Sequence, residues 1–300
     1  MFSYTGRRNL FGQLVNDSTT ATLSFGDSIM NDYEKQVLSS RPWWFVMRSN
    51  SDVLTVASQQ FYNVPFNYRK IDTVTVTSGT TNYNVQKCPS RDAWDRLNFT
   101  STPQSTWPQW YFIIDGQIGL WPIPSTADLP INFFYEARFK DLSIADYTTG
   151  TITTATNDSK AIVGSGTSWT DQMVRWIKIT ESNTDNTGDG NWYEIASIDT
   201  ATTLTLKAVY QGNSIAAGSA AYTLAQISQL PEAYQSLPIY HACYMYFSSI
   251  NPKMDRATMF KGMRDELLTQ MIQDQGKSGS QANVDLGPRL MQNVNLFHNS

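Results

Sequence analysis

The chain has 300 residues, a length that fits one large domain or two domains of ordinary size. Only 16% of the residues are charged, 41% are hydrophobic, 13% are aromatic, and the formal net charge is −4. Because there is no basic run, the sequence argues against a protein that grips nucleic acid through its phosphates. Low charge with nine Trp and fifteen Tyr favours a subunit buried against other subunits, although a well-filled core beneath a polar β surface accounts for the same composition.

The two cysteines, Cys88 and Cys243, lie far apart in the sequence and form no CxxC pair. We therefore expect neither a disulfide scaffold nor a zinc site, and free thiols suit assembly in a reducing cytoplasm. We also expect no signal peptide in Met1–Val15 and no transmembrane helix, because no stretch approaches ~18 consecutive apolar residues.

Two helices are predicted at the N-terminus. Thr5 is placed to cap a short helix that carries Leu10, Phe11, Leu14 and Val15, and Asp27 is placed to cap a second helix that ends at Pro42. Its buried stripe comprises Ile29, Tyr33, Val37 and Ser40. The cluster Trp43-Trp44-Phe45 that follows is typical of a core anchor.

The sequence from Asp52 to Tyr135 predicts mainly β-strands. Val74–Thr77 and Tyr83–Val85 predict a hairpin around Ser78-Gly79. Trp110–Ile114 and Ile118–Trp121 predict a second hairpin around Asp115-Gly116, which suits a type I′ turn. Ile131–Ala137 predicts a further strand.

From Tyr147 to Leu224 the composition shifts to Thr, Ser, Asn and Gly. Three strands are predicted at Val174–Ile179, Trp192–Ile198 and Thr203–Leu206, separated by turns. Short strands at regular spacing indicate a small β-sandwich or barrel, which we interpret as a domain inserted at an exposed loop.

After Ala225 the pattern becomes helical. A turn is predicted at Leu230–Ala233, then a helix with Pro238 in its first turn, then a break at Asn251-Pro252. A second helix follows, with repeating positions at Met254, Ala257, Phe260, Met263, Leu267 and Met271. Two helices joined by a short break predict an antiparallel hairpin.

The residues from Gly276 onward are predicted to form a loose arm. Its end regains apolar residues, which favours an arm that becomes ordered on a partner over a tail without a role. The candidate docking residues are Leu286, Leu290, Met291, Val294, Leu296 and Phe297.

These elements predict an α+β fold in which N- and C-terminal helices form a bundle with β hairpins. An inserted all-β domain and an extended C-terminal arm complete it. The expected limits are 1–146 with 225–275 for the helical and β body, 147–224 for the insert, and 276–300 for the arm.

No catalytic set can be assembled from the sequence. His241 and Cys243 are two residues apart and point about 200° apart on a helix, and we expect His241 to be a packing residue. The carboxylates of Asp92, Asp95, Asp265 and Glu266 lie among arginines, which is typical of surface ion pairs.

No metal or cofactor is predicted. The stretch 183–188 with Glu194 has the spacing of an EF-hand loop, but it departs from that pattern at its first and fifth positions. Strand-like sequence flanks it where helices are needed, so a polar hairpin loop is the better interpretation.

The order of segments resembles the head-to-tail adaptor family of tailed bacteriophages, of the podovirus type. The resemblance rests on an N-terminal helix, a Trp-Phe cluster, an aromatic hairpin ending in Pro-x-Pro, a Tyr-x-Ala stretch and a Leu-Pro-Glu opening. In this chain they are Ile29–Ser40, Trp43–Phe45, Trp110–Pro124, Tyr135-Glu136-Ala137 with Leu142-Ser143, and Leu230-Pro231-Glu232. The insert, through 163–170, 193–195, 204–206 and 210–212, is similar to a β module recurrent in phage structural proteins, which the usual adaptor lacks.

The resemblance implies a structural virion protein without enzymatic activity, assembled in the host cytoplasm. It implies a homo-oligomeric ring, a dodecamer, that joins the portal protein to a tail nozzle or tail tube protein. Passing DNA would traverse the ring without sequence-specific binding, no membrane is involved, and the arm from Gly276 would dock on the portal.

Two alternatives stay open. One is a tail protein that binds a glycan receptor or anchors fibres through the insert, with Trp169, Trp176, Trp192 and Tyr193 as its candidate contact surface. The other is a cell-wall hydrolase, against which the lack of an acid/base pair argues.

Overall fold

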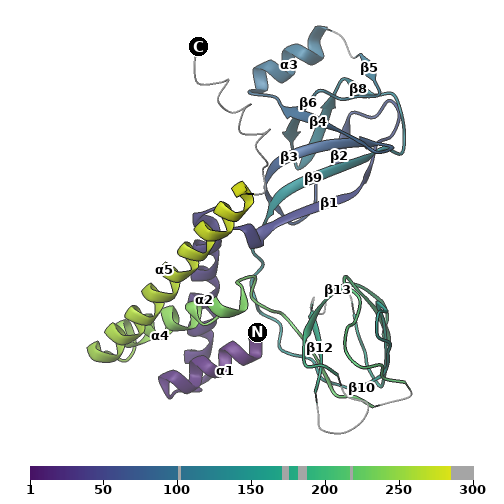
Figure 1. The fold of residues 1–300 in the computed structure, drawn as a ribbon. Helices are drawn as coiled ribbons and strands as arrows, with labels where there is room; N and C mark the ends of the chain where they lie inside the picture. Colours follow the sequence, from purple (N-terminus) through teal and green to yellow (C-terminus); the bar gives the residue numbers. More distant parts are fainter. Residues whose placement is uncertain (101–102, 171–175, 182–187, 217–218, 285–300) are drawn as a thin grey trace. The chain divides into compact units, whose positions relative to one another are not determined.

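The computed structural model describes residues 1–100, 103–170, 176–181, 188–216 and 219–284 (Figure 1). The chain packs as two compact units. The first unit comprises Met1–Val37 and Asp141–Ser300, and the second comprises Leu38–Lys140. The overall class is α+β, as the sequence predicts. In the described part of the chain no helix is long and apolar enough to cross a membrane.

The N-cap of helix α1 (Tyr4–Val15) lies two residues before the Thr5 that the sequence suggests. Ser3 is the N-cap, because its hydroxyl accepts a hydrogen bond from the Gly6 N–H at 3.0 Å. The predicted cap Thr5 is inside the helix, and its hydroxyl instead accepts the Asp146 N–H. Asn16 closes the helix in the left-handed conformation, at φ 56°.

Helix α2 (Thr20–Ser40) starts seven residues before the predicted cap at Asp27. Thr19 caps the helix, because its Oγ1 accepts the Thr22 N–H, and the Asp17 carboxylate holds this cap by accepting the Thr19 N–H and the Thr22 hydroxyl. Asp27 therefore lies within the helix, where it accepts the Tyr4 hydroxyl at 2.9 Å. The predicted end before Pro42 is confirmed.

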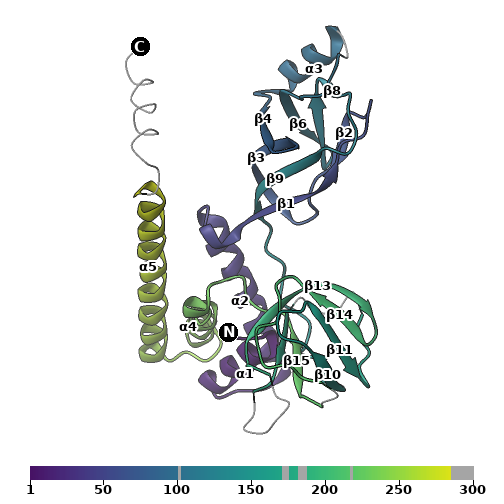
Figure 2. The same cartoon turned by 45° about the vertical axis from the view of Figure 1, so that its right-hand side comes forward.

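Helices α4 (Leu237–Ser249) and α5 (Met254–Val284) form the predicted hairpin (Figure 2). They follow a 3-10 turn, η2 (Glu232–Tyr234). Phe11 of α1 meets Tyr246 of α4 edge-on at 6.2 Å, and within the hairpin Phe247 of α4 stacks on Phe260 of α5 at 5.9 Å. The predicted bundle of N- and C-terminal helices is present in this unit.

One prediction for α5 needs correction. The helix does not stop at Gly276 but continues to Val284, because extending a formed helix costs much less than starting one and the glycines in this stretch do not outweigh that. Of the residues that repeat at helical spacing, Ala257, Phe260 and Met271 are buried, whereas Met254 and Met263 are exposed. Residues 285–300 lie outside the described part of the chain.

A six-stranded sheet forms between Asp141 and the helical hairpin, in the order β10-β11-β14-β13-β12-β15. The strands predicted near 176–179, 192–198 and 203–206 are present. The full set is β10 (Thr151–Ala155), β11 (Ala161–Ser165), β12 (Trp176–Ile179), β13 (Trp192–Thr200), β14 (Thr203–Leu206) and β15 (Tyr222–Ala225).

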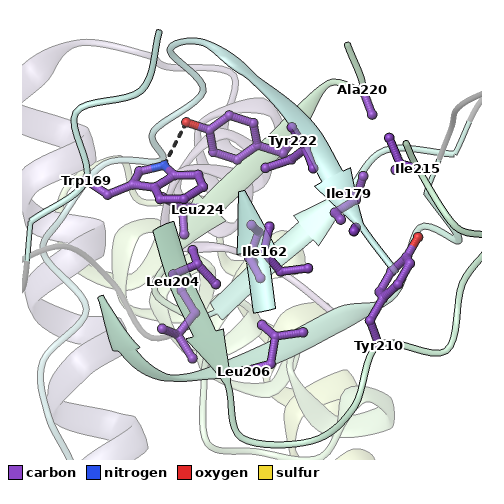
Figure 3. Close-up of a cluster of buried hydrophobic side chains, with 14 residues drawn as sticks. Ile162, Trp169, Ile179, Leu204, Leu206, Tyr210, Ile215, Ala220, Tyr222 and Leu224 are labelled. Atoms are coloured by element: carbon purple, nitrogen blue, oxygen red, sulfur yellow. Dashed lines mark hydrogen bonds between the residues drawn. The ribbon is translucent and has the colours of Figure 1, made fainter. Parts of the chain in front are cut away.

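The six-stranded sheet curls towards closure (Figure 2). Isolated bridges from Ile152 to Ala220 and from Ala155 to Ile215 tie the outer strand β10 to the segment leading into β15. The interior of the curled sheet is a close-packed apolar cluster that includes Ile162, Leu204 and Leu224 (Figure 3). Curling covers the sheet edges, which otherwise present unpaired N–H and C=O groups.

The second unit has a seven-stranded sheet in the order β1-β9-β3-β4-β6-β7-β2 (Figure 1). A short 3-10 turn, η1 (Trp44–Val46), precedes it. The strands are β1 (Met47–Leu54), β2 (Phe61–Asn63), β3 (Tyr68–Ser78), β4 (Thr81–Lys87), β6 (Trp110–Ile114), β7 (Gln117–Trp121) and β9 (Pro130–Ala137). Helix α3 (Arg91–Thr100) and a two-stranded pair, β5 (Gln104–Ser105) with β8 (Ile123–Pro124), complete the unit.

Both predicted hairpins of the second unit are confirmed. In the β6–β7 hairpin Asp115 and Gly116 have φ of 50° and 74°, the two positive values that a type I′ turn requires. Of the aromatic cluster, Trp43 is 1% exposed and stacks on Phe45, but Trp44 is 58% exposed. The anchor is therefore Trp43 and not the whole cluster.

Two helical glycines provide a test of the bundle packing. A Cβ at Gly26 in α2 would lie 2.4 Å from a ring carbon of Phe11, whereas a Cβ at Gly262 in α5 meets nothing within 4 Å. We expect Gly26→Ala to lower the free energy of unfolding by about 1–3 kcal/mol. Gly262→Ala should raise it by about 0.5–1 kcal/mol through helix propensity. Urea unfolding followed by circular dichroism measures both, and equal effects would contradict the packing of Phe11 against α2.

Candidate assembly surfaces and the polar junction

The predicted contact residues of the insert do not share one surface. Trp169 is 2% exposed and lies in the core, where its indole N–H donates to the Tyr222 hydroxyl at 2.9 Å (Figure 3). Tyr193 is half-buried against the same core, and its hydroxyl donates to Asp189 at 2.5 Å. Trp169 is therefore a packing residue and not a contact residue, because Gly164 leaves space that its ring fills.

Trp176 and Trp192 lie on the opposite face of the sheet from that core. Ile177 and Ile179 of β12 point into the core, so Trp176 and Lys178 point outward. Trp192 of β13 pairs directly with Lys178, whose ammonium lies 5.3 Å from the indole ring. These two half-buried indoles are the part of the predicted surface that remains available.

The six docking residues predicted for the C-terminal arm, Leu286 to Phe297, lie outside the described residues, as do positions 183–187 of the EF-hand-like stretch. Glu194 from the end of that stretch forms an ion pair with Lys207 at 3.1 Å. Among the residues that the structure describes, no group of three His, Cys, Asp or Glu side chains is placed to hold a metal ion.

The residues considered for catalysis pack or pair as the sequence indicates. His241 stacks on Tyr33 at 3.9 Å between ring centres, and its Nδ1 lies 3.0 Å from Arg264 Nη1. Since a guanidinium only donates, Nδ1 accepts and the imidazole is neutral. Cys243 is fully buried, and burial raises the pKa of its thiol to about 12. Asp95 and Asp265 pair with Arg91 and Arg264 at the surface.

Sequence reasoning missed a buried polar cluster that joins four segments of the first unit, which we call the polar junction. It comprises Arg7, Asn31, Glu34 and Ser228 together with the main chain at Leu142 and Gln229. Arg7 is 2% exposed and Glu34 is 0% exposed, and Arg7 Nη1 lies 3.2 Å from Glu34 Oε2. No motif signals this pair, because its members are 27 residues apart on two different helices.

Every polar atom of the Glu34 carboxylate has a partner in the polar junction. Oε2 receives Arg7, while Oε1 accepts the Ser228 hydroxyl at 2.6 Å and the Gln229 N–H at 3.2 Å. Burial raises the pKa of Glu34, and these donors act in the opposite direction by stabilising the carboxylate. The contacts hold the segment that leaves the curled sheet against α1 and α2.

Asn31 fixes the segment that enters the curled sheet. Its side chain makes two hydrogen bonds with the main chain of Leu142, at 3.1 and 3.2 Å, and its Oδ1 also accepts Arg7 Nη2 at 2.5 Å. A second layer lies beside it, where the Gln226 side chain accepts the N–H groups of Ser143 and Ile144. The six-stranded sheet is therefore held at both its entry and its exit by the first two helices.

Several large apolar side chains are exposed in both units of the protein. On the helical hairpin Ile250, Met254, Met259 and Met263 are exposed. In the second unit Phe99 is 90% exposed, Phe66 is 79% exposed, and Trp44 and Phe134 are also exposed. Apolar groups of this size are expected at surfaces that other chains cover.

A family model described as SU10 adaptor protein matches residues 8–158, about half of the chain. The match begins in α1, spans the whole second unit and ends just beyond β10. No curated protein matches the chain. The fold and the match define a bacteriophage adaptor, a structural class of protein. The chain belongs to the SU10 adaptor protein family, so the expected membership of a phage adaptor family is confirmed.

The polar junction predicts a large effect of removing one charge. Glu34→Ala leaves the Arg7 guanidinium buried without a counter-ion, and we expect a loss of about 3–5 kcal/mol in the free energy of unfolding. Lys35→Ala removes the neighbouring Lys35–Asp141 pair, whose side chains are about half exposed, and should cost at most about 1 kcal/mol. Helical circular dichroism during urea unfolding compares the two. Equal losses would show that the junction does not hold the helices.

The environment of His241 predicts an acid-sensitive bundle. Burial, with the nearby Arg264 cation, lowers the pKa of His241 to about 4 from an ordinary value of 6.5. Between those values the unfolded chain binds the proton and the folded chain does not, so stability falls as the pH drops from 6.5 to 4. An NMR titration should give a midpoint near 4 for His241, assigned with His298→Gln. His241→Gln should flatten the fall in stability over that range, and a midpoint above 6 would contradict the packing.

Proposed function

We propose that this adaptor forms a homo-oligomeric ring, a dodecamer, in the neck of the virion, where it links the portal to a tail nozzle or tail tube. The family membership is the observation that carries the proposal. The ring would continue the channel for DNA, whose passage needs no sequence-specific contact. A net charge of −4 suits such a channel, because a duplex that must move is not attracted to its wall.

The exposed apolar side chains support the proposal that each subunit is partly buried by its neighbours. Met259 and Met263 lie one turn apart on α5 and are both exposed, so this part of the helix presents two apolar side chains on one face. Phe66 and Phe99 supply similar groups in the second unit. A ring subunit has two neighbours of its own kind and a partner at each end, which accounts for apolar groups in several places.

The apolar-tipped C-terminal segment would dock on the portal. Attachment of each subunit would order its arm, and the completed ring would create the next surface for the tail. The podovirus type of neck and the likeness of the curled sheet to a module recurrent in phage proteins belong to the same proposal. The outward pair Trp176 and Trp192 is its candidate contact with a fibre or a neighbouring subunit.

Deleting residues 285–300 tests the docking arm. Because every described element ends by Val284, the shortened chain should keep its circular dichroism spectrum and unfolding midpoint. We expect it to lose attachment to its own portal at least tenfold, measured by mass photometry and electron microscopy of the mixture. A ring still bound to the portal without the arm would contradict this part of the proposal.

Two full-length variants separate the chemistry of the arm from its length. Replacing the six apolar arm residues by Ser should abolish attachment as the deletion does, because buried apolar area drives the docking. Replacing Gln292, Asn293 and Asn295 by Ala should leave it intact. If the Ala variant fails as badly as the Ser variant, the apolar residues do not carry the binding.

A further inference from the structure

A groove opens in the second unit where two parallel strands separate. Strand β4 pairs with β6 only at Gln86 and Lys87, opposite Trp110 and Tyr111. The last bond before the strands part runs from the Gln86 N–H to the Gln109 carbonyl, at 2.8 Å. Between the free flank of β4 and the loop leading into β6 lies an open cavity of about 370 Å³. This volume is in the range of sites for small ligands.

Aromatic rings from both sides line this groove. Tyr83 of β4 and Trp107 of the loop stack with their ring centres 3.7 Å apart, and Trp110 lies beside them at the start of β6. All three are half-buried, so each keeps part of its ring surface open. The stack also joins the two walls of the groove, which gives the site a fixed shape before any ligand arrives.

The polar part of the lining consists of amides. Asn84, Gln86 and Gln109 are exposed, and within the described part of the chain their side-chain amides make no hydrogen bond. Each amide offers donors and an acceptor together. None of the residues that line the groove is charged, so it has no group that would favour an ionic ligand.

We infer that this groove is a binding site for a neutral saccharide. A sugar ring presents an apolar C–H face that packs on an aromatic ring and a rim of hydroxyls that both donate and accept. Tyr83, Trp107 and Trp110 match the face, and the three amides match the rim. The site goes beyond the proposed function, which assigns no ligand to this groove, and it differs from the glycan surface that the sequence suggests at 147–224.

Saturation-transfer NMR on the full chain tests the site with neutral oligosaccharides of glucose, galactose and N-acetylglucosamine. We expect at least one of these to bind, and hyaluronan fragments of equal length, which are anionic, to bind at least tenfold more weakly. Trp107→Ala and Asn84→Ala should each weaken binding at least tenfold. Asn84 is an exposed side chain, so its variant keeps the test valid if the loss of Trp107 disturbs the loop.

Trp44→Ala is the matched control, because Trp44 is an exposed indole of the same unit outside the groove. It should leave saccharide binding unchanged. The inference is overturned if no neutral saccharide binds, if Trp44→Ala weakens binding as much as Trp107→Ala, or if the groove variants impair only subunit assembly. The last outcome would show that the groove contacts another protein chain. None of these outcomes bears on attachment to the portal.

Discussion

The buried Arg7–Glu34 pair is the interaction on which the first unit depends. Two charges removed from water are tolerated only when hydrogen bonds satisfy them. Here both oxygens of Glu34 and both terminal nitrogens of Arg7 have partners, while the Arg7 Nε has none among the described residues. Glu34 accepts a hydrogen bond from Ser228, in the segment that leaves the six-stranded sheet. Asn31 donates one to the carbonyl of Leu142, in the segment that leads into that sheet. An apolar core at the same position would not specify which loop lies where, whereas directional bonds do.

This arrangement fixes both ends of the six-stranded sheet, which lies between Thr151 and Ala225 in the chain. The segments that enter and leave the sheet meet at α2, where Asn31 holds Leu142 and Glu34 holds Gln229. The sheet then closes much of its own edge through the bridges from Ile152 and Ala155 and carries its own apolar core. Bundle and sheet therefore have separate cores joined by a polar junction.

Local chemistry made parts of this fold predictable from sequence. Asp115-Gly116 predicts its hairpin because the turn requires two positive φ angles, and Pro42 predicts the end of α2 because it cannot continue a helix. The prediction that Asp27 caps α2 was wrong, because a carboxylate that can cap a helix can equally accept a hydrogen bond from another helix, here from Tyr4. The polar junction and the Tyr83–Trp107 groove had no signal, since each joins residues more than twenty positions apart.

Low charge has a physical consequence for such an adaptor. Exposed ion pairs contribute little and are screened by salt, so a chain with 16% charged residues has few long-range forces to orient its partners. Specific contact has to come from shape and from apolar groups such as Phe66, Phe99 and Met263, which act only at close range. Those groups also favour wrong association while they are uncovered. Covering those groups would therefore remove a hazard of wrong association as well as provide specific contact.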